Sequence, residues 1–368
     1  MKSRTRLKSF GVSGTFLDDT HNPSFESADV AVFGVAFDAT TSYNTGARFG
    51  PSAIMAASHQ IEFEIPAIGI SLASRVKIHS LGNLEYSQNQ TEKKRGTPKT
   101  AALTARMVHE VQTLAEKIFR EKKLLVGFGG EHSVSNGIFR AMAKQYVPKD
   151  ITIVHFDAHL DMRDAWDGLQ YSHGSVMRRC LEKGFQTVHI GIRDHISEEE
   201  AKFIKKTGLA NRIFPCATMP QAYYGKKNSS FLRKNFVWNG RITKELTKKI
   251  LPQIRTPYAY LTIDVDAFDP KDFPGTGTPL PFGLDFSSTQ DFLFELILHL
   301  KKNGVCLLGF DIQETAPQLR RPVKNYDARE TVSTKTEMNA ALLIYKLLLW
   351  HFLERFSNPK NPKKVRQL

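Results

Sequence analysis

Cysteine is scarce in this chain of 368 residues, and a long uninterrupted apolar run is missing. The three cysteines, Cys180, Cys216 and Cys306, lie far apart without a C-x-x-C pair, which argues against a disulfide framework and a thiolate metal site. The most apolar stretch is interrupted by Lys346 and His351 and is too short to cross a membrane. No apolar segment of a secretory signal follows the basic first ten residues. We therefore expect a soluble, cytoplasmic protein with reduced thiols.

Basic residues outnumber acidic ones, and the formal net charge of +14 could indicate nucleic-acid binding. The lysines and arginines are nevertheless divided among several segments, namely residues 2–8, 93–99, 202–206, 244–249 and 360–366. No zinc finger, RNP-type aromatic motif or helix-turn-helix pattern accompanies them. We interpret these segments as solvated edges and expect neither nucleic acid nor a membrane as a partner. The alternative is a non-catalytic binding protein whose basic edges contact an acidic partner.

Apolar strand patterns alternate with helical patterns along most of the chain, which is 41 % hydrophobic and can bury a large core. Buried strands are predicted at residues 29–37, 123–128, 151–156, 187–192, 257–263 and 305–310. Helices are predicted from Pro51 onward and at residues 100–121, 134–145, 174–183, 198–206, 243–250, 285–302 and 336–356. This alternation predicts an α/β fold, in which a mostly parallel sheet is covered on both faces and binds ligands at the carboxyl ends of its strands.

Both ends and one internal segment depart from this alternation. Residues 1–28 have little periodicity and are predicted to form an N-terminal arm. Residues 211–251 are polar, basic and in places aromatic, and we interpret them as an insertion. Residues 357–368 form a basic C-terminal tail. The remainder, residues 29–356, is predicted to be a single domain.

The stretch I-T-I-V-H-F-D-A-H-L-D, residues 151–161, begins as a buried strand and ends with alternating polar residues. Side chains alternate faces along a strand, so Asp157, His159 and Asp161 point the same way if strand geometry persists to that end. Two carboxylates and an imidazole on one face need a cation, and this ligand set suits Mn, Fe, Ni or Zn. Taken alone, the pattern also fits a strand followed by a polar loop.

Three further strand ends carry chemically similar residues: His132, the pair Asp264 and Asp266, and Glu314. Several carboxylates in one dry crevice cannot all remain ionised without compensation, because their charges repel. Four aspartates balance two divalent ions, with the histidines as neutral ligands, which predicts metal-assisted hydrolysis. A cationic substrate such as a guanidinium fits the residual negative charge, and Glu314 could orient it through paired hydrogen bonds.

These residues lie in motifs that resemble the ureohydrolases, the arginase and agmatinase family. The motifs are Thr-Thr-Ser-Tyr-x-x-Gly-x-Arg-Phe-Gly-Pro (40–51), Gly-Gly-Glu-His-Ser (129–133), Asp-Ala-His-Leu-Asp (157–161), Ser-His-Gly (172–174), Thr-Ile-Asp-Val-Asp-Ala-Phe-Asp-Pro (262–270) and Pro-Gly-Thr-Gly-Thr-Pro (274–279). They occur in the family's order, and the resemblance covers roughly residues 33–334. It implies an arginase-like, three-layer α/β/α fold, a ureohydrolase-like catalytic domain at residues 29–356, and a trimer or hexamer.

The resemblance also implies a binuclear centre, with Mn²⁺ as the expected metal and Ni²⁺ as the alternative. One ion would be held by His132, Asp157, Asp161 and Asp264, and the other by Asp157, His159, Asp264 and Asp266, so that Asp157 and Asp264 bridge. A hydroxide between the ions would attack the guanidinium carbon and release urea. His173 matches the family's proton-shuttling histidine and Glu314 its guanidinium-binding glutamate; we count both, together with Asp161, as catalytic.

The loop Y-S-H-G-S-V-M-R-R, residues 171–179, is similar to that of agmatinases, whereas arginases carry an asparagine where Tyr171 stands. We therefore expect agmatine to be hydrolysed to putrescine and urea. The alternatives are guanidinobutyrase, guanidinopropionase, guanidine hydrolase and arginase. Three departures from the family pattern leave the substrate open. Glu131 replaces a common aspartate, residues 313–317 differ from those usual around the glutamate, and residues 211–251 with the basic tail make the chain longer than a typical agmatinase.

Overall fold

The computed structural model describes residues 7–356 apart from positions 10, 12–13, 20, 63, 66–69, 87–95, 217–235, 238, 320–330 and 334. The predicted basic tail at residues 357–368 therefore lies outside the described residues, as does much of the predicted insertion at 211–251.

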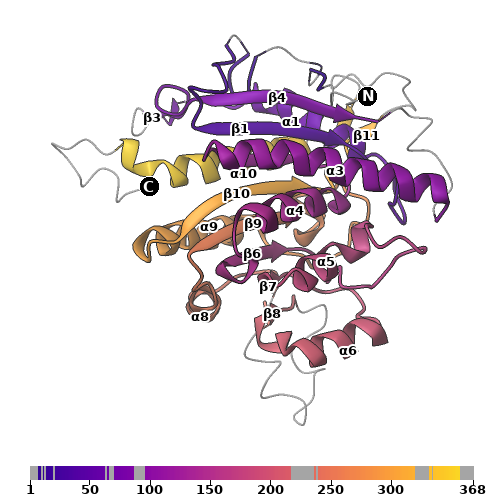
Figure 1. Ribbon diagram of the computed structural model, residues 1–368. Helices are drawn as coiled ribbons and strands as arrows, with labels where there is room; N and C mark the ends of the chain where they lie inside the picture. Colours follow the sequence, from indigo (N-terminus) through magenta and orange to yellow (C-terminus); the bar gives the residue numbers. More distant parts are fainter. Residues whose placement is uncertain are drawn as a thin grey trace.

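A sheet of eight strands forms the centre of the molecule, and every neighbouring pair runs parallel (Figure 1). In spatial order the strands are β4 (Ile78–Glu85), β1 (Val30–Ala36), β5 (Leu124–Phe128), β10 (Cys306–Gln313), β9 (Tyr258–Asp264), β6 (Ile151–Phe156), β7 (Gln186–Ile190) and β8 (Ile213–Phe214). The predicted α/β class with a mostly parallel sheet is confirmed.

Helices cover both faces of this sheet, as the two buried apolar clusters show. One face is covered by α1 (Gly50–Ser58), α8 (Lys244–Ile250), α9 (Phe286–Lys302) and α10 (Lys335–His351). The other is covered by α3 (Pro98–Arg120), α4 (Ser135–Gln145), α5 (Val176–Glu182) and α6 (Glu198–Thr207). The three-layer α/β/α arrangement is confirmed.

Shorter elements connect these layers. Two small antiparallel pairs are formed by β2 (Glu64–Ile65) with β3 (Ile70–Ser71) and by β11 (Gln318–Leu319) with β12 (Thr331–Ser333). The 3-10 turns are η1 (Ala47–Phe49), η2 (His132–Val134), η3 (Pro148–Asp150), η4 (His173–Ser175), η5 (Leu209–Arg212), η7 (Leu251–Gln253), η8 (Val265–Ala267) and η10 (Leu353–Phe356). Three of these turns, η2, η4 and η8, hold predicted site residues.

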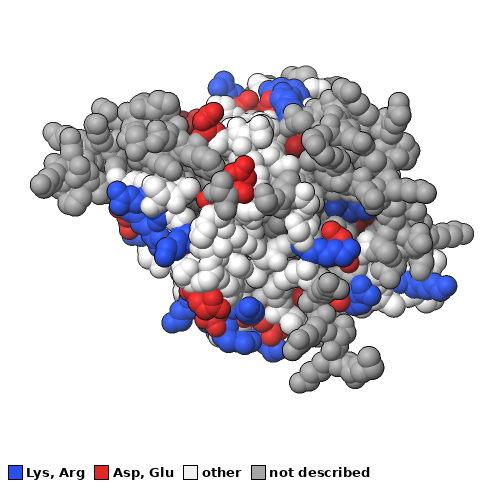
Figure 2. All heavy atoms as spheres, turned by 90° about the horizontal axis from the view of Figure 1, so that it is seen from above, with Lys and Arg blue, Asp and Glu red and all other residues white. Residues whose placement is uncertain are grey.

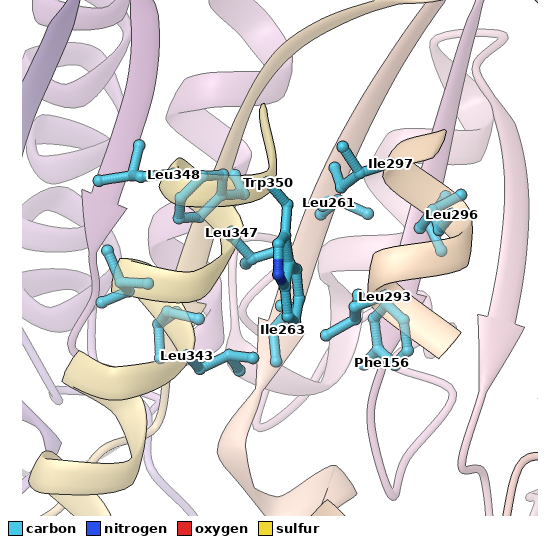
Figure 3. Packing of buried hydrophobic residues seen from close by; sticks show 14 of the residues in the cluster. Phe156, Leu261, Ile263, Leu293, Leu296, Ile297, Leu343, Leu347, Leu348 and Trp350 are labelled. Carbon is cyan, nitrogen blue, oxygen red and sulfur yellow. The ribbon is translucent and has the colours of Figure 1, made fainter. Parts of the chain in front are cut away.

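Side chains that alternate along each strand contribute to the buried apolar clusters on both faces of the sheet. In β6, Val154 and Phe156 belong to the cluster beneath α9 and α10, whereas Ile151 and Ile153 belong to the opposite cluster. Figure 3 shows Phe156 against α9, with Trp350 of α10 in the same layer. Burying each such side chain contributes about 1.5–3 kcal/mol, so strand β6 is firmly anchored before it reaches the site.

The pattern-based prediction missed two strands at the edges of the sheet. Strand β4, I-H-S-L-G-N-L-E, is not an apolar run, because His79, Ser80 and Asn83 stand between its apolar residues. Strand β8 has only two residues, within the segment predicted as an insertion.

Phe16 and Leu17 of the predicted arm are buried in the core, and Lys8 exchanges backbone hydrogen bonds with Asn83 of β4.

Of the predicted basic segments, residues 360–366 and parts of residues 2–8 and 93–99 lie outside the described residues. On the face shown in Figure 2, lysines and arginines form several separate groups, with acidic residues among them. Among the described residues, no helix is long and apolar enough to cross a membrane.

Candidate metal centre and active site

Four neighbouring strands deliver the predicted site residues to one edge of the sheet. In spatial order β5, β10, β9 and β6 lie side by side, and all four run in the same direction. His132 follows β5, Glu314 follows β10, Asp264 ends β9 and Asp157 follows β6. The carboxyl ends of parallel strands are the usual ligand-binding edge of such a sheet.

Three carboxylates surround one ring nitrogen of His132. Its Nδ1 lies 3.0 Å from Asp157 Oδ2, 3.3 Å from Asp264 Oδ2 and 3.4 Å from Asp161 Oδ2. All four side chains are buried, and Nδ1 has no hydrogen-bond partner among the described residues. The sequence predicted these four residues as one ligand group, and the fold brings them together.

The opposite side of the ring fixes where the His132 proton resides. Nε2 lies 2.9 Å from the Thr262 hydroxyl, and that hydroxyl donates its hydrogen to Asp311 Oδ1 at 2.6 Å. Thr262 must therefore accept from Nε2, so the neutral ring presents its Nδ1 lone pair to the three carboxylates. Electron-rich atoms that converge without a donor between them form a cation site, and imidazole with carboxylates suits a transition-metal ion.

A second group lies beside the first and shares Asp157 with it. His159 Nδ1 is 3.3 Å from Asp157 Oδ1 and 3.0 Å from Asp266 Oδ2. Asp157 thus turns one oxygen toward each histidine. Asp264 connects the groups in another way, because its Oδ1 accepts from the Asp266 backbone N–H at 2.8 Å while its Oδ2 faces His132. The arrangement fits two cations with a shared carboxylate.

The pKa values of Asp161, Asp264 and His132 are raised, which shows that positive charge is favoured at this site. Burial and the charge of Asp157 raise the pKa of Asp161 to about 7. Burial and the charges of Asp266 and Asp157 raise the pKa of Asp264 well above its usual value. Burial lowers the pKa of His132, but the three carboxylates outweigh it and raise that pKa. A proton on Nδ1 satisfies one oxygen at a time, whereas a divalent cation satisfies all of them.

The prediction that strand alternation brings Asp157, His159 and Asp161 to one face is wrong. Strand β6 ends at Phe156, and Asp161 has a left-handed backbone with φ of 53°, so strand alternation does not extend through them. A hydrogen-bonded loop positions them instead. The His159 N–H donates to Asp157 Oδ1 at 2.6 Å, and the carbonyl of Asp161 accepts from the backbone of α5.

Sequence analysis missed a histidine chain behind Asp157. His155 Nε2 lies 2.8 Å from Asp157 Oδ2, and its Nδ1 lies 2.9 Å from His189 Nδ1 on the neighbouring strand β7. His189 in turn contacts the Thr187 hydroxyl at 2.8 Å. His155 lies close enough to His132, Asp157 and Asp161 to bind the same cation. Its Nε2, however, already contacts Asp157 Oδ2. The available signal was a polar residue in an otherwise apolar strand.

The two groups form the floor of a cavity of about 160 Å³. Glu314 lines it and is anchored by the His132 backbone N–H, which donates to its Oε1 at 2.9 Å. His173 also lines it, with its ring edge-on to Trp166 at 5.8 Å, and the Arg163 guanidinium lies over Trp166 at 4.5 Å. Every predicted site residue except Asp157 lines this cavity, and Asp157 lies between the two histidines below it.

The arginase family model matches residues 28–227 and 221–350. The chain belongs to the arginase family. It is 32 % identical over 333 residues to the N(1)-aminopropylagmatine ureohydrolase of Synechocystis, which covers 90 % of this chain and 92 % of that relative. It is 30 % identical over 307 residues to the agmatinase of Bacillus anthracis, covering 83 % and 89 %. The resemblance drawn from the motifs is thereby confirmed.

Solved structures of the arginase family share the fold. The agmatine ureohydrolase of Thermoplasma volcanium superimposes with a TM-score of 0.63 at 25 % identity, covering 91 % of this chain and 92 % of that one. Proclavaminate amidino hydrolase from Streptomyces clavuligerus gives a TM-score of 0.69 at 24 % identity, covering 92 % and 96 %. The arginase-like fold is confirmed.

Metal binding should depend on the two aspartates that connect the groups. Replacing Asp157 or Asp264 by Ala is expected to abolish binding of at least one divalent metal ion per chain, because each variant deletes an oxygen facing His132. Metal content after gel filtration measures this directly. Asp164→Ala serves as control, since Asp164 is exposed and pairs with Arg179. Unchanged stoichiometry in both site variants would refute the shared-carboxylate arrangement.

Proposed function

We propose that this protein hydrolyses agmatine to putrescine and urea. The observation that carries the proposal is the common cavity, in which Glu314 stands beside two imidazole–carboxylate groups suited to divalent cations. A buried carboxylate is a suitable partner for a guanidinium, which it can bind through two parallel hydrogen bonds. Relatives named agmatinase support agmatine as the guanidino compound.

The proposed cofactors are two Mn²⁺ ions, with Ni²⁺ as the alternative. The chain would hold one ion with His132, Asp157, Asp161 and Asp264, and the other with Asp157, His159, Asp264 and Asp266. When bound, such ions supply Lewis acidity that makes hydroxide available near neutral pH. The Thr262–Asp311 pair behind His132 keeps that ring in the tautomer required of a ligand.

The remaining site residues would bind the substrate and move protons. Glu314 would grip the guanidinium, and the absence of a side chain at Gly277 keeps space beside its Oε2, since a Cβ there would lie 3.4 Å away. Water adds to the guanidinium carbon and forms a tetrahedral intermediate. Collapse of this intermediate breaks the bond to the alkyl nitrogen, so that urea forms and the departing amine takes up a proton. His173 would deliver that proton, because it lines the same cavity as Glu314. Asp161, which lines the same cavity, would assist as a metal ligand.

We further propose a cytoplasmic homo-oligomer, a trimer or hexamer, with the catalytic domain at residues 29–356. The three cysteines are free thiols, which suits a reducing compartment. Described parts of the N-terminal arm and of the segment at residues 211–251 belong to the core and the sheet of this domain, and the basic tail is proposed as an addition to it.

A urea-release screen tests the proposed reaction. Protein loaded separately with Mn²⁺ and Ni²⁺ is given agmatine, 4-guanidinobutyrate, 3-guanidinopropionate, guanidine or arginine. We expect the highest kcat/KM with agmatine and Mn²⁺, and loss of urea release in Glu314→Ala because the guanidinium loses its anchor. The proposal is to be abandoned if agmatine yields no urea while another guanidino compound does.

One observation favours a second candidate, the hydrolysis of a guanidino acid. The Arg163 guanidinium lines the cavity from its position over Trp166. A cation there would attract a carboxylate at the far end of the substrate and repel the ammonium of agmatine. Asp194, which is exposed and lines the same cavity, has the opposite preference. The balance between these two side chains would decide between agmatine and guanidinobutyrate.

Two charge-removing variants measure that balance. Arg163→Gln should raise the ratio of kcat/KM for agmatine over 4-guanidinobutyrate by about threefold or more, because the repulsion of the ammonium is removed. Asp194→Asn should lower the same ratio. Steady-state kinetics with both substrates on both variants give the two ratios. If neither ratio changes, these side chains do not read the distal group of the substrate.

A further inference from the structure

Thr40 joins two residues that are far from it in the sequence, Glu131 and His173. It lies in the loop after β1 and does not line the cavity itself. Its backbone N–H donates to Glu131 Oε2 at 2.6 Å, and its hydroxyl donates to Glu131 Oε1. Its Oγ1 also lies 3.2 Å from His173 Nδ1 and 3.1 Å from the His173 backbone nitrogen. All three residues are therefore linked through one hydroxyl group.

The directions of these hydrogen bonds follow from the number of available protons. Glu131 is fully buried and receives a further hydroxyl donor from Ser133 at 2.6 Å, whereas the Thr41 hydroxyl, 3.3 Å from Glu131 Oε2, donates to the Asp38 carbonyl at 3.0 Å. Such a set of donors suits a carboxylate that acts only as an acceptor. The single hydroxyl hydrogen of Thr40 is thus directed at Glu131. Toward His173, Thr40 can only accept, so Nδ1 must carry the proton.

We propose that Thr40, held by Glu131, is a positioning residue that fixes the tautomer and orientation of His173. With Nδ1 protonated, Nε2 becomes the nitrogen that accepts and releases a proton during the reaction. This inference rests on the proposed function, in which His173 delivers a proton to the departing amine. Thr40 acts without touching the substrate, in the way that an orienting partner serves a catalytic histidine.

Two further contacts hold the same arrangement. The His173 backbone N–H donates to the Thr40 hydroxyl oxygen, so the main chain and the ring are fixed at one point. On another side, the ring packs edge-on against Trp166. Glu131 stands where aspartate is common in the family. Its carboxylate holds Thr40 in place by accepting hydrogen bonds from both the amide and the hydroxyl of Thr40.

A matched pair of variants at position 40 tests this role. Thr40→Val removes the hydroxyl at nearly constant volume, and Thr40→Ser retains it. We expect Thr40→Val to lower kcat for agmatine by about tenfold or more with KM changed by less than about twofold, because proton transfer by a positioned group is worth about 10²–10⁴ in rate. Thr40→Ser should restore most of the activity, and both variants should keep the wild-type metal content.

A second measurement reads the tautomer independently of turnover. In protein labelled with ¹⁵N-histidine and loaded with the diamagnetic ion Zn²⁺, which does not broaden nearby signals, the His173 signals are assigned among the 12 histidines by their loss in His173→Gln. We expect a protonated Nδ1 and an unprotonated Nε2 in the wild type and in Thr40→Ser, and a mixture of tautomers in Thr40→Val.

The outcomes separate this inference from the proposed function. Wild-type kcat together with an unchanged tautomer in Thr40→Val would overturn the role of Thr40 and leave the proposed function standing. A protonated Nε2 in the wild type would also overturn it. If the wild type releases no urea from any guanidino compound, the proposed function fails, and the ¹⁵N spectra still decide whether Thr40 sets the tautomer.

Discussion

Repulsion among buried carboxylates is the constraint on which the rest of the site depends. Asp157, Asp161 and Asp264 direct oxygens at one unprotonated nitrogen of His132, and a hydrogen-bonded threonine on the other side of the ring maintains that tautomer. Such an arrangement costs free energy unless a cation occupies its centre. The residues stay in place in spite of this repulsion, because they follow or end four adjacent parallel strands that are packed between the two apolar layers. Catalytic sites commonly combine rigid support with locally unfavourable electrostatics.

Two concentric shells of polar residues surround the cation site. The inner residues supply the carboxylate oxygens and ring nitrogens that face the cation site. The outer residues form hydrogen bonds to them and thereby determine which atoms carry protons. Thr262 performs this task for His132, and His155 contacts the shared carboxylate of Asp157 from within strand β6. Thr40 has the same relation to His173 across the cavity. In each case a neutral side chain behind the site controls the chemistry of a residue within it.

The layers of the fold could be predicted because buried parallel strands are apolar throughout and helices carry a periodic stripe. Strand β4 escaped prediction because it lies at the edge of the sheet and polar residues such as His79, Ser80 and Asn83 interrupt its apolar pattern. His132, Asp264 and Glu314 could be predicted because they follow recognisable strands. The convergence of Asp157 and Asp161 was predicted for the wrong reason, since a loop produces it. The link from Thr40 to Glu131 and His173 could not be predicted, because it joins residues 91 and 133 positions apart through a three-dimensional contact.

If Asp157 holds both proposed metal ions, they would lie close enough to interact magnetically. Electron paramagnetic resonance of the purified protein, titrated with Mn²⁺ to saturation, measures this most directly. We predict that two ions bind per chain and that their spectrum is that of an exchange-coupled pair. A six-line spectrum of isolated Mn²⁺ at saturation, with one ion per chain, would contradict the binuclear site.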